Sequence, residues 1–271
     1  MDNLRTEQEA SFERRFAGLA RLYGVSGAKA IAHSHVVVVG IGGVGSWTAE
    51  SLARSGVGTL SLIDLDHVSE SNVNRQIHAL TDTLGMSKVL AMKERIAQIN
   101  PNCKVNCIDD FVTPENWTQL LEQISSTPIS AIVDACDQVK AKVAIAAWAI
   151  ERQDDIANTY LPFITVGAAG GKRWAHKVDI QDLAKVSHDP LLAQLRTRLR
   201  KEHSAAREGK PIRVHCVYST EPVKGPDSSC DVLTDGSLNC HGYGSSVSVT
   251  STFGQCAAGW ICDQLALGAG A

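Results

Sequence analysis

The sequence predicts a doubly wound α/β protein built on a mainly parallel, Rossmann-like sheet, and three observations support this fold class. Residues 36–45 read VVVVGIGGVG, a run of β-branched residues typical of a buried parallel strand, followed by glycines that permit a tight turn into a helix. Short apolar runs then alternate with segments of helical periodicity as far as residue 166. The chain has 271 residues, 44% of them hydrophobic, which is enough for one large or two closely joined α/β domains.

The part of the chain before residue 170 alternates predicted strands and helices. A helical region opens it, because aromatic and leucine side chains recur there at helical spacing. Later helices carry their apolar residues on one face, and Asn100-Pro101 ends one of them. Residues 66–84 are polar and predict a loop. The predicted strands are 36–39, 60–63, 104–108, 129–133 and 163–166, and the predicted helices are 8–32, 44–55, 85–99, 114–124 and 139–152.

After the glycine-rich run at 167–171 the pattern loosens. We predict here an appended α+β region for substrate binding and dimerisation, rather than an independent domain. It contains strand-like segments and helices at 177–180, 190–206, 214–219 and 247–270. The two predicted parts of the chain are therefore 1–170, which carries the nucleotide-binding fold, and 171–271.

The C-terminal segment 247–270 is apolar and rich in small residues. Asp263 and Gln264 lie within it, among Ser, Thr and Gly residues. This composition favours a buried or subunit-interface helix over a membrane span. Peripheral membrane association through this helix is the alternative.

The cysteines, the N-terminus and the net charge indicate which metal sites, cellular compartment and partners to expect. The eight cysteines include no CxxC pair, so we expect no structural zinc site of four cysteines. The N-terminus is polar and charged and shows no signal peptide, which indicates a reduced, cytoplasmic protein. The formal net charge is −3, so overall charge does not predict a nucleic-acid partner.

The glycine loop and the end of the next strand predict a nucleotide site. Glycines let the backbone turn tightly and approach phosphate oxygens at a helix N-terminus. Asp64 and Asp66 follow strand 60–63, where a carboxylate can accept hydrogen bonds from ribose hydroxyls. A dinucleotide cofactor would need little more than these features. The glycines of the loop are Gly40, Gly42, Gly43 and Gly45.

Three further residues suit the cleavage of a triphosphate. Arg75 can hold phosphate oxygens with two parallel hydrogen bonds. Lys88 begins a predicted helix, where its ammonium and the helix dipole act together on an anion. Asp137, in DACD at a strand end, can hold Mg²⁺ against the phosphates. Arg75 and Lys88 follow strand 60–63 and Asp137 follows strand 129–133, and because a redox cofactor needs none of these charged groups, the sequence favours ATP.

The combination of GIGGVG, DLDHVSESNVNRQ (64–76), the Lys88 helix and DACD (134–137) resembles the ubiquitin-activating-enzyme-like superfamily, which includes ThiF and MoeB. The resemblance covers about residues 10–170 and implies an enzyme that adenylates a carboxylate with ATP. It implies that Asp64 binds the ribose and that Asp137 takes the magnesium. The residues that it implies for the triphosphate are Asn72, Arg75, Gln76 and Lys88.

A closer similarity extends over nearly the full length. RRFAGLARLYG (14–24), NRQIHAL (74–80), QINPNCKV (98–105), DDFVTPEN (109–116), DLAKVSHDPL (182–191) and VYSTEP (217–222) resemble the tRNA threonylcarbamoyladenosine dehydratase family. This resemblance implies ATP-dependent dehydration of N6-threonylcarbamoyladenosine to its cyclic form beside the tRNA anticodon. The threonyl carboxylate would be adenylated, and its own carbamoyl group would then displace AMP.

Basic residues gather between 196 and 213 on an otherwise acidic chain. Such a cluster is either a solvated helix face or a footprint for the phosphates of a nucleic acid. The family resemblance favours the second interpretation, with tRNA as the partner. The residues predicted to bind tRNA are Arg196, Arg198, Arg200 and Lys201.

The resemblance also implies protein partners. Homodimeric members supply an arginine to the phosphates from the partner's N-terminal helix; Gly18 stands at that position here, so Arg15 or Arg21 are the substitutes to consider. The family is linked to a cysteine desulfurase and its SufE-like sulfur acceptor. Cys240, in NCHGYG, is the predicted contact for the sulfur acceptor, and an unreactive loop thiol is the alternative.

Three other functions remain to be separated from this one. An activator of a ubiquitin-like sulfur-carrier protein would adenylate a protein C-terminus, and the absent CxxC pairs count against it. An NAD-dependent oxidoreductase would use the glycine loop and Asp64 but would leave Arg75, Lys88 and Asp137 without a task. A non-catalytic binding module would keep the fold as a scaffold and would tolerate the loss of Arg75 and Asp137.

Overall fold

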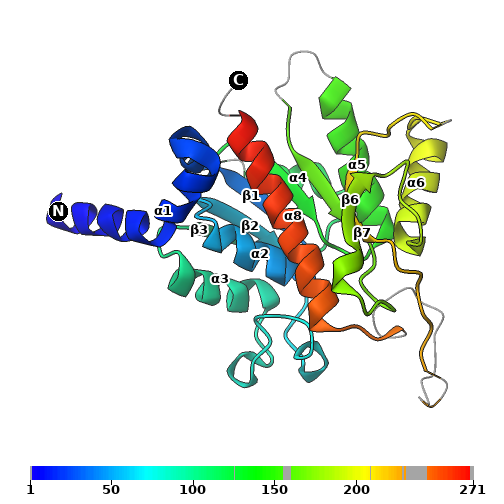
Figure 1. Ribbon diagram of the computed structural model, residues 1–271, viewed down its shortest axis with the longest axis horizontal. Helices are drawn as coiled ribbons and strands as arrows, with labels where there is room; N and C mark the ends of the chain where they lie inside the picture. Colours follow the sequence, from blue (N-terminus) through cyan, green and yellow to red (C-terminus); the bar gives the residue numbers. More distant parts are fainter. Residues whose placement is uncertain are drawn as a thin grey trace.

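The computed structural model describes residues 2–124, 126–154, 160–207, 209–227, 229 and 243–268. Its centre is a seven-stranded sheet with helices on both faces, which confirms the predicted α/β class (Figure 1). The strands run in the order β3-β2-β1-β4-β5-β7-β6. Their bounds are β1 His35–Val39, β2 Thr59–Ile63, β3 Lys104–Ile108, β4 Ala131–Asp134, β5 Phe163–Val166, β6 Val178–Asp182 and β7 His215–Ser219.

The helices cover the two faces of the sheet in two groups. The bounds of the first group are α1 Asp2–His33, α2 Gly45–Arg54, α3 Lys88–Ile99 and α8 Val247–Gly268, and those of the second are α4 Trp117–Ile124, α5 Val139–Asp154 and α6 Pro190–Glu202. Each group closes its own hydrophobic core against the fully buried valines of β1, whose side chains alternate between the two faces.

The sheet reverses its order beside β1, and this places the candidate site. β1 pairs in parallel with β2 on one side and with β4 on the other. In open α/β sheets ligands bind outside the carboxyl ends of the strands at such a switch point. The loops that follow β1, β2 and β4 carry the glycines, Asp64 and Asp137, so these residues meet at one edge.

The sheet is larger than the five strands expected. β7 pairs in parallel with β5, and β6 pairs antiparallel with β7. Both strands come from the predicted appended region. β7 is buried from Cys216 to Ser219, and the mostly half-buried β6 forms the edge of the same sheet. The strands of 1–170 and of 171–271 therefore form one continuous sheet.

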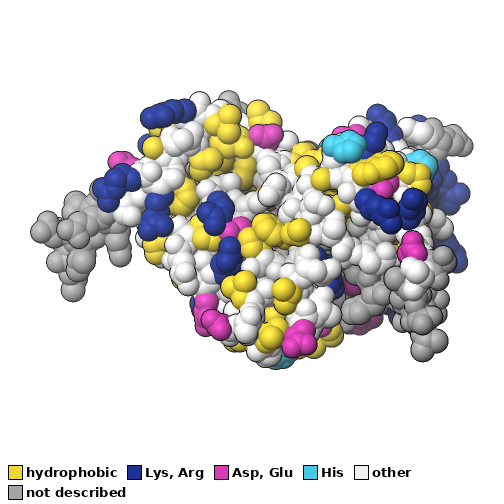
Figure 2. Space-filling view, turned by 60° about the horizontal axis from the view of Figure 1, so that its bottom comes forward, with side chains coloured by type: hydrophobic (Ala, Val, Ile, Leu, Met, Phe, Trp, Pro, Cys, Tyr) yellow, Lys and Arg dark blue, Asp and Glu magenta, His cyan; other side chains and the backbone are white. Residues whose placement is uncertain are grey.

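The C-terminal helix α8 packs across α2 and beside the end of α1 (Figure 1). Gly254 allows this close approach, because a Cβ there would lie 2.6 Å from the carbonyl oxygen of Val44. Among the described residues no helix is long and apolar enough to cross a membrane. Leu22, Val25 and Leu267 stay 72%, 65% and 69% exposed. Figure 2 shows several groups of hydrophobic side chains on the face that it presents, one of them at its upper left.

Candidate active site

A cavity of about 540 Å³ opens at the carboxyl ends of the central strands. This volume lies within the range of small-molecule sites. Its walls come from the glycine loop, from the loops after β2, β4 and β5, and from Thr250 at the start of α8. The predicted site residues that line it are Gly40, Gly42, Gly43, Asp64, Asp66, Asn72, Arg75, Gln76, Lys88 and Asp137.

The glycine loop is shaped by steric limits at its two ends. Gly40 has a φ of +83°, and a Cβ there would lie 2.8 Å from the backbone nitrogen of Cys136. A Cβ on Gly45 would overlap the carbonyl oxygen of Gly40. A Cβ on Gly42 would meet nothing, since it would enter the open cavity. α2 begins at Gly45 without a side-chain cap. The Ser46 N–H donates to the carbonyl oxygen of Gly42 at 3.1 Å, which leaves the N–H groups of Gly45 and Trp47 suited to a phosphate.

Asp64 is the buried carboxylate of the site, with 9% of its surface exposed. Its Oδ2 accepts a hydrogen bond of 2.6 Å from the N–H of Ile41, and its Oδ1 accepts one of 2.9 Å from the N–H of Asp66. Burial raises the pKa of Asp64, while Lys88 and these two N–H groups oppose the rise. The bonds fix the carboxylate beside the glycine loop, where a ribose would lie.

Lys88 is the first residue of α3 and is only 6% exposed. Its ammonium donates a hydrogen bond of 2.6 Å to Asp66 Oδ2 and lies 3.9 Å from Asp64 Oδ1. The two carboxylates hold the cation at the cavity wall. This arrangement gives a positive charge in a nearly dry position, where its effect on an anion is stronger than in water.

Asn72, Arg75 and Gln76 follow β2 on one short loop. Asn72 is buried, and its Oδ1 accepts a hydrogen bond of 3.1 Å from the N–H of Ser69. Gln76 is also buried, and its Oε1 has no hydrogen-bond partner within the described part of the chain. The half-buried Arg75 donates to the carbonyl oxygen of Ser71 and to Asn74 Oδ1. Its guanidinium therefore retains N–H donors for phosphate oxygens.

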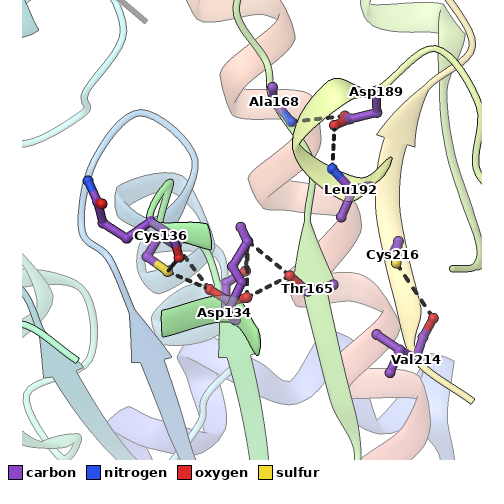
Figure 3. Close-up of polar contacts among 10 residues, drawn as sticks. Asp134, Cys136, Thr165, Ala168, Asp189, Leu192, Val214 and Cys216 are labelled. Carbon is purple, nitrogen blue, oxygen red and sulfur yellow. Dashed lines mark hydrogen bonds and ion pairs between the residues drawn. The ribbon is translucent and has the colours of Figure 1, made fainter. Parts of the chain in front are cut away.

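Beneath the cavity floor lies a buried network that the sequence did not indicate. The Lys142 ammonium is 3.0 Å from Asp134 Oδ2, and the Thr165 hydroxyl donates to the same oxygen at 2.6 Å. In Figure 3, Asp134 and Thr165 point toward each other from the neighbouring strands β4 and β5. Burial alone would lower the pKa of Lys142, but the adjacent Asp134 outweighs it and raises the pKa.

Cys136 joins this network from the cavity side. Its thiol donates to Asp134 Oδ1 at 3.0 Å (Figure 3). Burial, reinforced by Asp134, raises the pKa of Cys136 well above the usual value for a thiol. The protonated thiol is a poor nucleophile at neutral pH, so its place here is structural. One residue further on, Asp137 is exposed at the cavity rim and accepts a weak hydrogen bond of 3.4 Å from Gln138.

The loop after β5 forms the opposite wall, and Asp189 fixes it. The Ala168 N–H donates to Asp189 Oδ2 at 2.9 Å, and the Leu192 N–H donates to Oδ1 at 3.0 Å (Figure 3). A Cβ on Gly167 would overlap the same carboxylate. Asp189 therefore caps α6 and holds the cavity wall at the same time. No pattern in the sequence indicates this second task.

The predicted tRNA-binding residues occupy the last turns of α6, away from the cavity, which the helix touches through Pro190 and Leu191. Arg196 donates to the carbonyl oxygens of Leu183 and Val186 at 2.9 and 2.8 Å. Arg200 donates to that of Ala206 at 3.0 Å. Arg198 is half-buried and Lys201 exposed. Cys240 lies outside the described residues.

Comparison with known proteins places this geometry in a family. The family model described as ThiF family matches residues 13–240. The tRNA threonylcarbamoyladenosine dehydratase of Escherichia coli is 42% identical over 253 residues, which cover 90% of each chain. The Haemophilus influenzae protein of that name is 38% identical over 94% of each chain. The chain belongs to the ThiF family. Within it, the chain belongs to the tRNA threonylcarbamoyladenosine dehydratases.

The fold of this ThiF-family chain agrees with that of a solved relative. The crystal structure of the E. coli dehydratase TcdA in complex with ATP matches with a TM-score of 0.81 and 39% identity, and the match covers 95% of this chain and 96% of that one. Because the match runs through both predicted parts, the similarity includes β6, β7 and α8 as well as the nucleotide-binding half.

Proposed function

We propose that this chain uses ATP to convert N6-threonylcarbamoyladenosine in tRNA to its cyclic form, by adenylating the threonyl carboxylate. The observation that carries the proposal is the convergence of Arg75, Lys88 and Asp137 on one cavity. A redox cofactor would need the glycine loop and Asp64 but not these three charged groups. Full-length similarity to named dehydratases supports tRNA as the substrate, and the ATP complex of the E. coli relative supports ATP as the nucleotide.

The residues of this chain divide the work by position. Asp64 would bind the ribose, and the glycine loop with the first N–H groups of α2 would hold phosphate oxygens. Lys88 and Arg75, with Asn72 and Gln76 beside them, would take the charge that builds up on the leaving pyrophosphate. The carboxylate attacks the α-phosphorus, and the bond to pyrophosphate breaks.

The second step needs no nucleophile from the protein. The carbamoyl group of the substrate attacks the acyl carbon, AMP leaves with one former carboxylate oxygen, and a proton is released. The net change in the nucleoside is the loss of one water. Intramolecular attack is fast because the reacting groups are already held together. The wall at residues 167–170, fixed by Asp189, is the surface on which we place the substrate.

Asp137 fits a magnesium ion that arrives with the nucleotide. Magnesium is usually bound by one or two carboxylates together with phosphates and water. Asp137 is one exposed carboxylate at the cavity rim, and the described residues include no cluster of three metal-binding side chains. Bound magnesium would neutralise phosphate charge. The Asp137 carboxylate at the cavity rim would be its protein ligand.

The proposal extends to assembly and setting. We infer a homodimer, because exposed Leu22, Val25 and Leu267 would be covered by a second copy. A cytoplasmic setting is supported by the free thiols of the described cysteines. Contact with a cysteine desulfurase and a SufE-like acceptor through Cys240 rests on the sequence alone.

An isotope experiment tests the chemistry. tRNA whose threonyl carboxylate carries ¹⁸O is incubated with the protein, ATP and Mg²⁺. The masses of the resulting nucleosides and nucleotides are then measured by mass spectrometry. The expected products are AMP with one ¹⁸O and a nucleoside lighter by one water. ADP in place of AMP, or an unchanged nucleoside, would contradict the proposal. Pyrophosphate exchange dependent on a ubiquitin-like protein would favour an activator of such proteins instead.

A further inference from the structure

A second cavity lies at the far end of α2 from the glycine loop. It has a volume of about 470 Å³ and is lined by Arg15, Phe16, Arg54, Arg95, Gln98 and Ile99, which we call the arginine pocket. Gly45 begins α2 at the active site and Arg54 ends it here. Ten residues at 1.5 Å per residue put about 15 Å between the two cavities. The arginine pocket is therefore a separate site.

Three helices each bring one arginine to this pocket. Arg15 comes from α1, Arg54 from α2 and Arg95 from α3. Phe16 packs α1 against the residues that follow α2. Its ring lies beside Gly56, where an added Cβ would be 3.3 Å from the Cγ of Phe16. The Arg15 guanidinium donates to the carbonyl oxygen of Ile99 at 2.9 Å. Tertiary packing, and not the local sequence, gathers the three charges.

One buried carboxylate serves two of these arginines. Glu50 is 3% exposed, and its Oε1 accepts from Arg54 at 2.8 Å and from Arg95 at 3.2 Å. Its Oε2 accepts from Arg95 at 2.7 Å. Three positive charges thus face one negative charge, which is already fully hydrogen-bonded. The side chains of Arg54 and Arg95 are 59% and 30% exposed, so solvent screens part of their mutual repulsion, and a bound anion would reduce what remains.

The guanidinium groups keep donors for that anion. Each has five N–H groups, and the contacts with described residues use about two on each arginine. Planar guanidinium groups from several directions match the oxygens of a phosphate.

We propose that Arg15, Arg54 and Arg95 form a second phosphate-binding site. The phosphate belongs either to the tRNA backbone, in which case the inference rests on the proposed function, or to free phosphate. The distance of about 15 Å between the arginine pocket and the active site is shorter than one duplex turn of about 34 Å. One nucleic acid can therefore contact both sites.

The test compares Arg54→Gln and Arg15→Gln with Arg14→Gln, which removes the same charge from an exposed position outside the pocket. In the first arm, binding of modified tRNA is measured without ATP at several salt concentrations. A tRNA contact predicts affinity about 3- to 10-fold weaker for the pocket variants and a salt slope lower by about 1, with Arg14→Gln unchanged.

The second arm measures the rise in melting temperature with inorganic phosphate, against chloride at equal ionic strength. Arg54 does not line the active site, so active-site phosphate contributes equally to Arg54→Gln and Arg14→Gln, and a smaller rise in Arg54→Gln than in Arg14→Gln assigns free phosphate to the pocket. If pocket and control variants behave alike in both arms, the inference is overturned. Neither arm involves turnover, so failure of the cyclisation reaction would be seen separately.

Discussion

The ammonium of Lys142 lies 3.0 Å from Asp134 Oδ2, and neither side chain is exposed to solvent. This pair connects the core to the active site, because Asp134 is the last residue of β4 and Asp137 follows three residues later at the cavity rim. Thr165 and Cys136 bind the same carboxylate. The loop that carries Asp137 is thus held from below by a fully hydrogen-bonded buried charge.

Replacing Lys142 with methionine is expected to destabilise the protein strongly. The change leaves the Asp134 carboxylate buried without its cation, and breaking a buried pair in this way typically costs about 3–5 kcal/mol. Urea unfolding measures the loss. Lys140→Met is the matched control, since Lys140 is exposed on the same helix. Equal stability of the two variants would mean that the ion pair contributes nothing.

The stability of the protein should depend on His78 between pH 6.5 and pH 4. His78 is 1% exposed, and burial, with Lys88 and Arg95 nearby, lowers its pKa to about 4. Below pH 6.5 the unfolded chain binds a proton there that the folded chain does not bind, so folding weakens as the pH falls. The expected loss in free energy of unfolding attributable to His78 is about 1.5 kcal/mol between pH 6.5 and 5.

The variant His78→Leu isolates this contribution. Neither ring nitrogen of His78 has a hydrogen-bond partner within the described residues, so an apolar side chain removes the titration without breaking a bond. Urea unfolding of both proteins at pH 6.5 and 5 gives the comparison. The wild type should lose more free energy of unfolding than His78→Leu over this interval; parallel losses would contradict the assignment.

Lys88→Ala should slow adenylation far more than it weakens tRNA binding. The ammonium lies at the cavity wall, where removing one preorganised charge donor typically costs about 10²–10³-fold in kcat. Pyrophosphate release measures the first effect, and tRNA affinity without ATP measures the second. Lys93→Ala, on an exposed position of the same helix, should change neither. Similar losses in both assays for Lys88→Ala would show that the two tasks are not divided.

The basic residues of α6 should not all respond alike. Arg198→Gln with Lys201→Gln is expected to weaken tRNA binding and lower its salt slope by about 1 to 2. Arg196→Gln should instead lower stability, because its guanidinium ties α6 to the carbonyl oxygens of Leu183 and Val186. The charge-matched control is Arg14→Gln with Lys29→Gln, both exposed on α1. An equal loss of tRNA affinity in the control would indicate nonspecific charge.

The nucleotide half of the site could be predicted because its signals are local. A β-branched run, a glycine loop and a carboxylate at the next strand end follow one another within 30 residues, and the parallel sheet brings such strand ends together. Gly40, Asp64 and Lys88 accordingly line one cavity, and their roles toward a nucleotide stay predictions.

The supporting groups could not be predicted, because their partners are distant in the sequence. Lys140 and Lys142 look alike in an apolar helix, and only the packing of α5 against Asp134 and Thr165 buries the second of them. Asp189 reaches Ala168 across 21 residues. Charge alone predicts tRNA binding by Arg196, because the sequence does not show that the carbonyl oxygens of Leu183 and Val186 lie within reach of its guanidinium. Long-range packing determines the contacts of Lys142, Asp189 and Arg196.

Substitutions in the glycine loop should separate folding from nucleotide binding. Gly40→Ala places a Cβ 2.8 Å from the backbone nitrogen of Cys136 and forces a side chain onto a φ of +83°. The left-handed conformation alone costs about 1–2 kcal/mol, so thermal unfolding should occur at a clearly lower temperature. Gly42→Ala places its Cβ in the open cavity, touching no described atom within 4 Å.

The Gly42→Ala variant should therefore fold as well as the wild type but bind ATP poorly, since its methyl group occupies space that a phosphate would use. We expect a melting temperature close to that of the wild type and a KM for ATP higher by about 10-fold, equivalent to 1.4 kcal/mol. Scanning calorimetry and initial rates of pyrophosphate release measure the two quantities. A Gly42→Ala protein with unchanged KM would place the phosphates away from the glycine loop, whereas an unfolded one would show that Gly42 serves the fold.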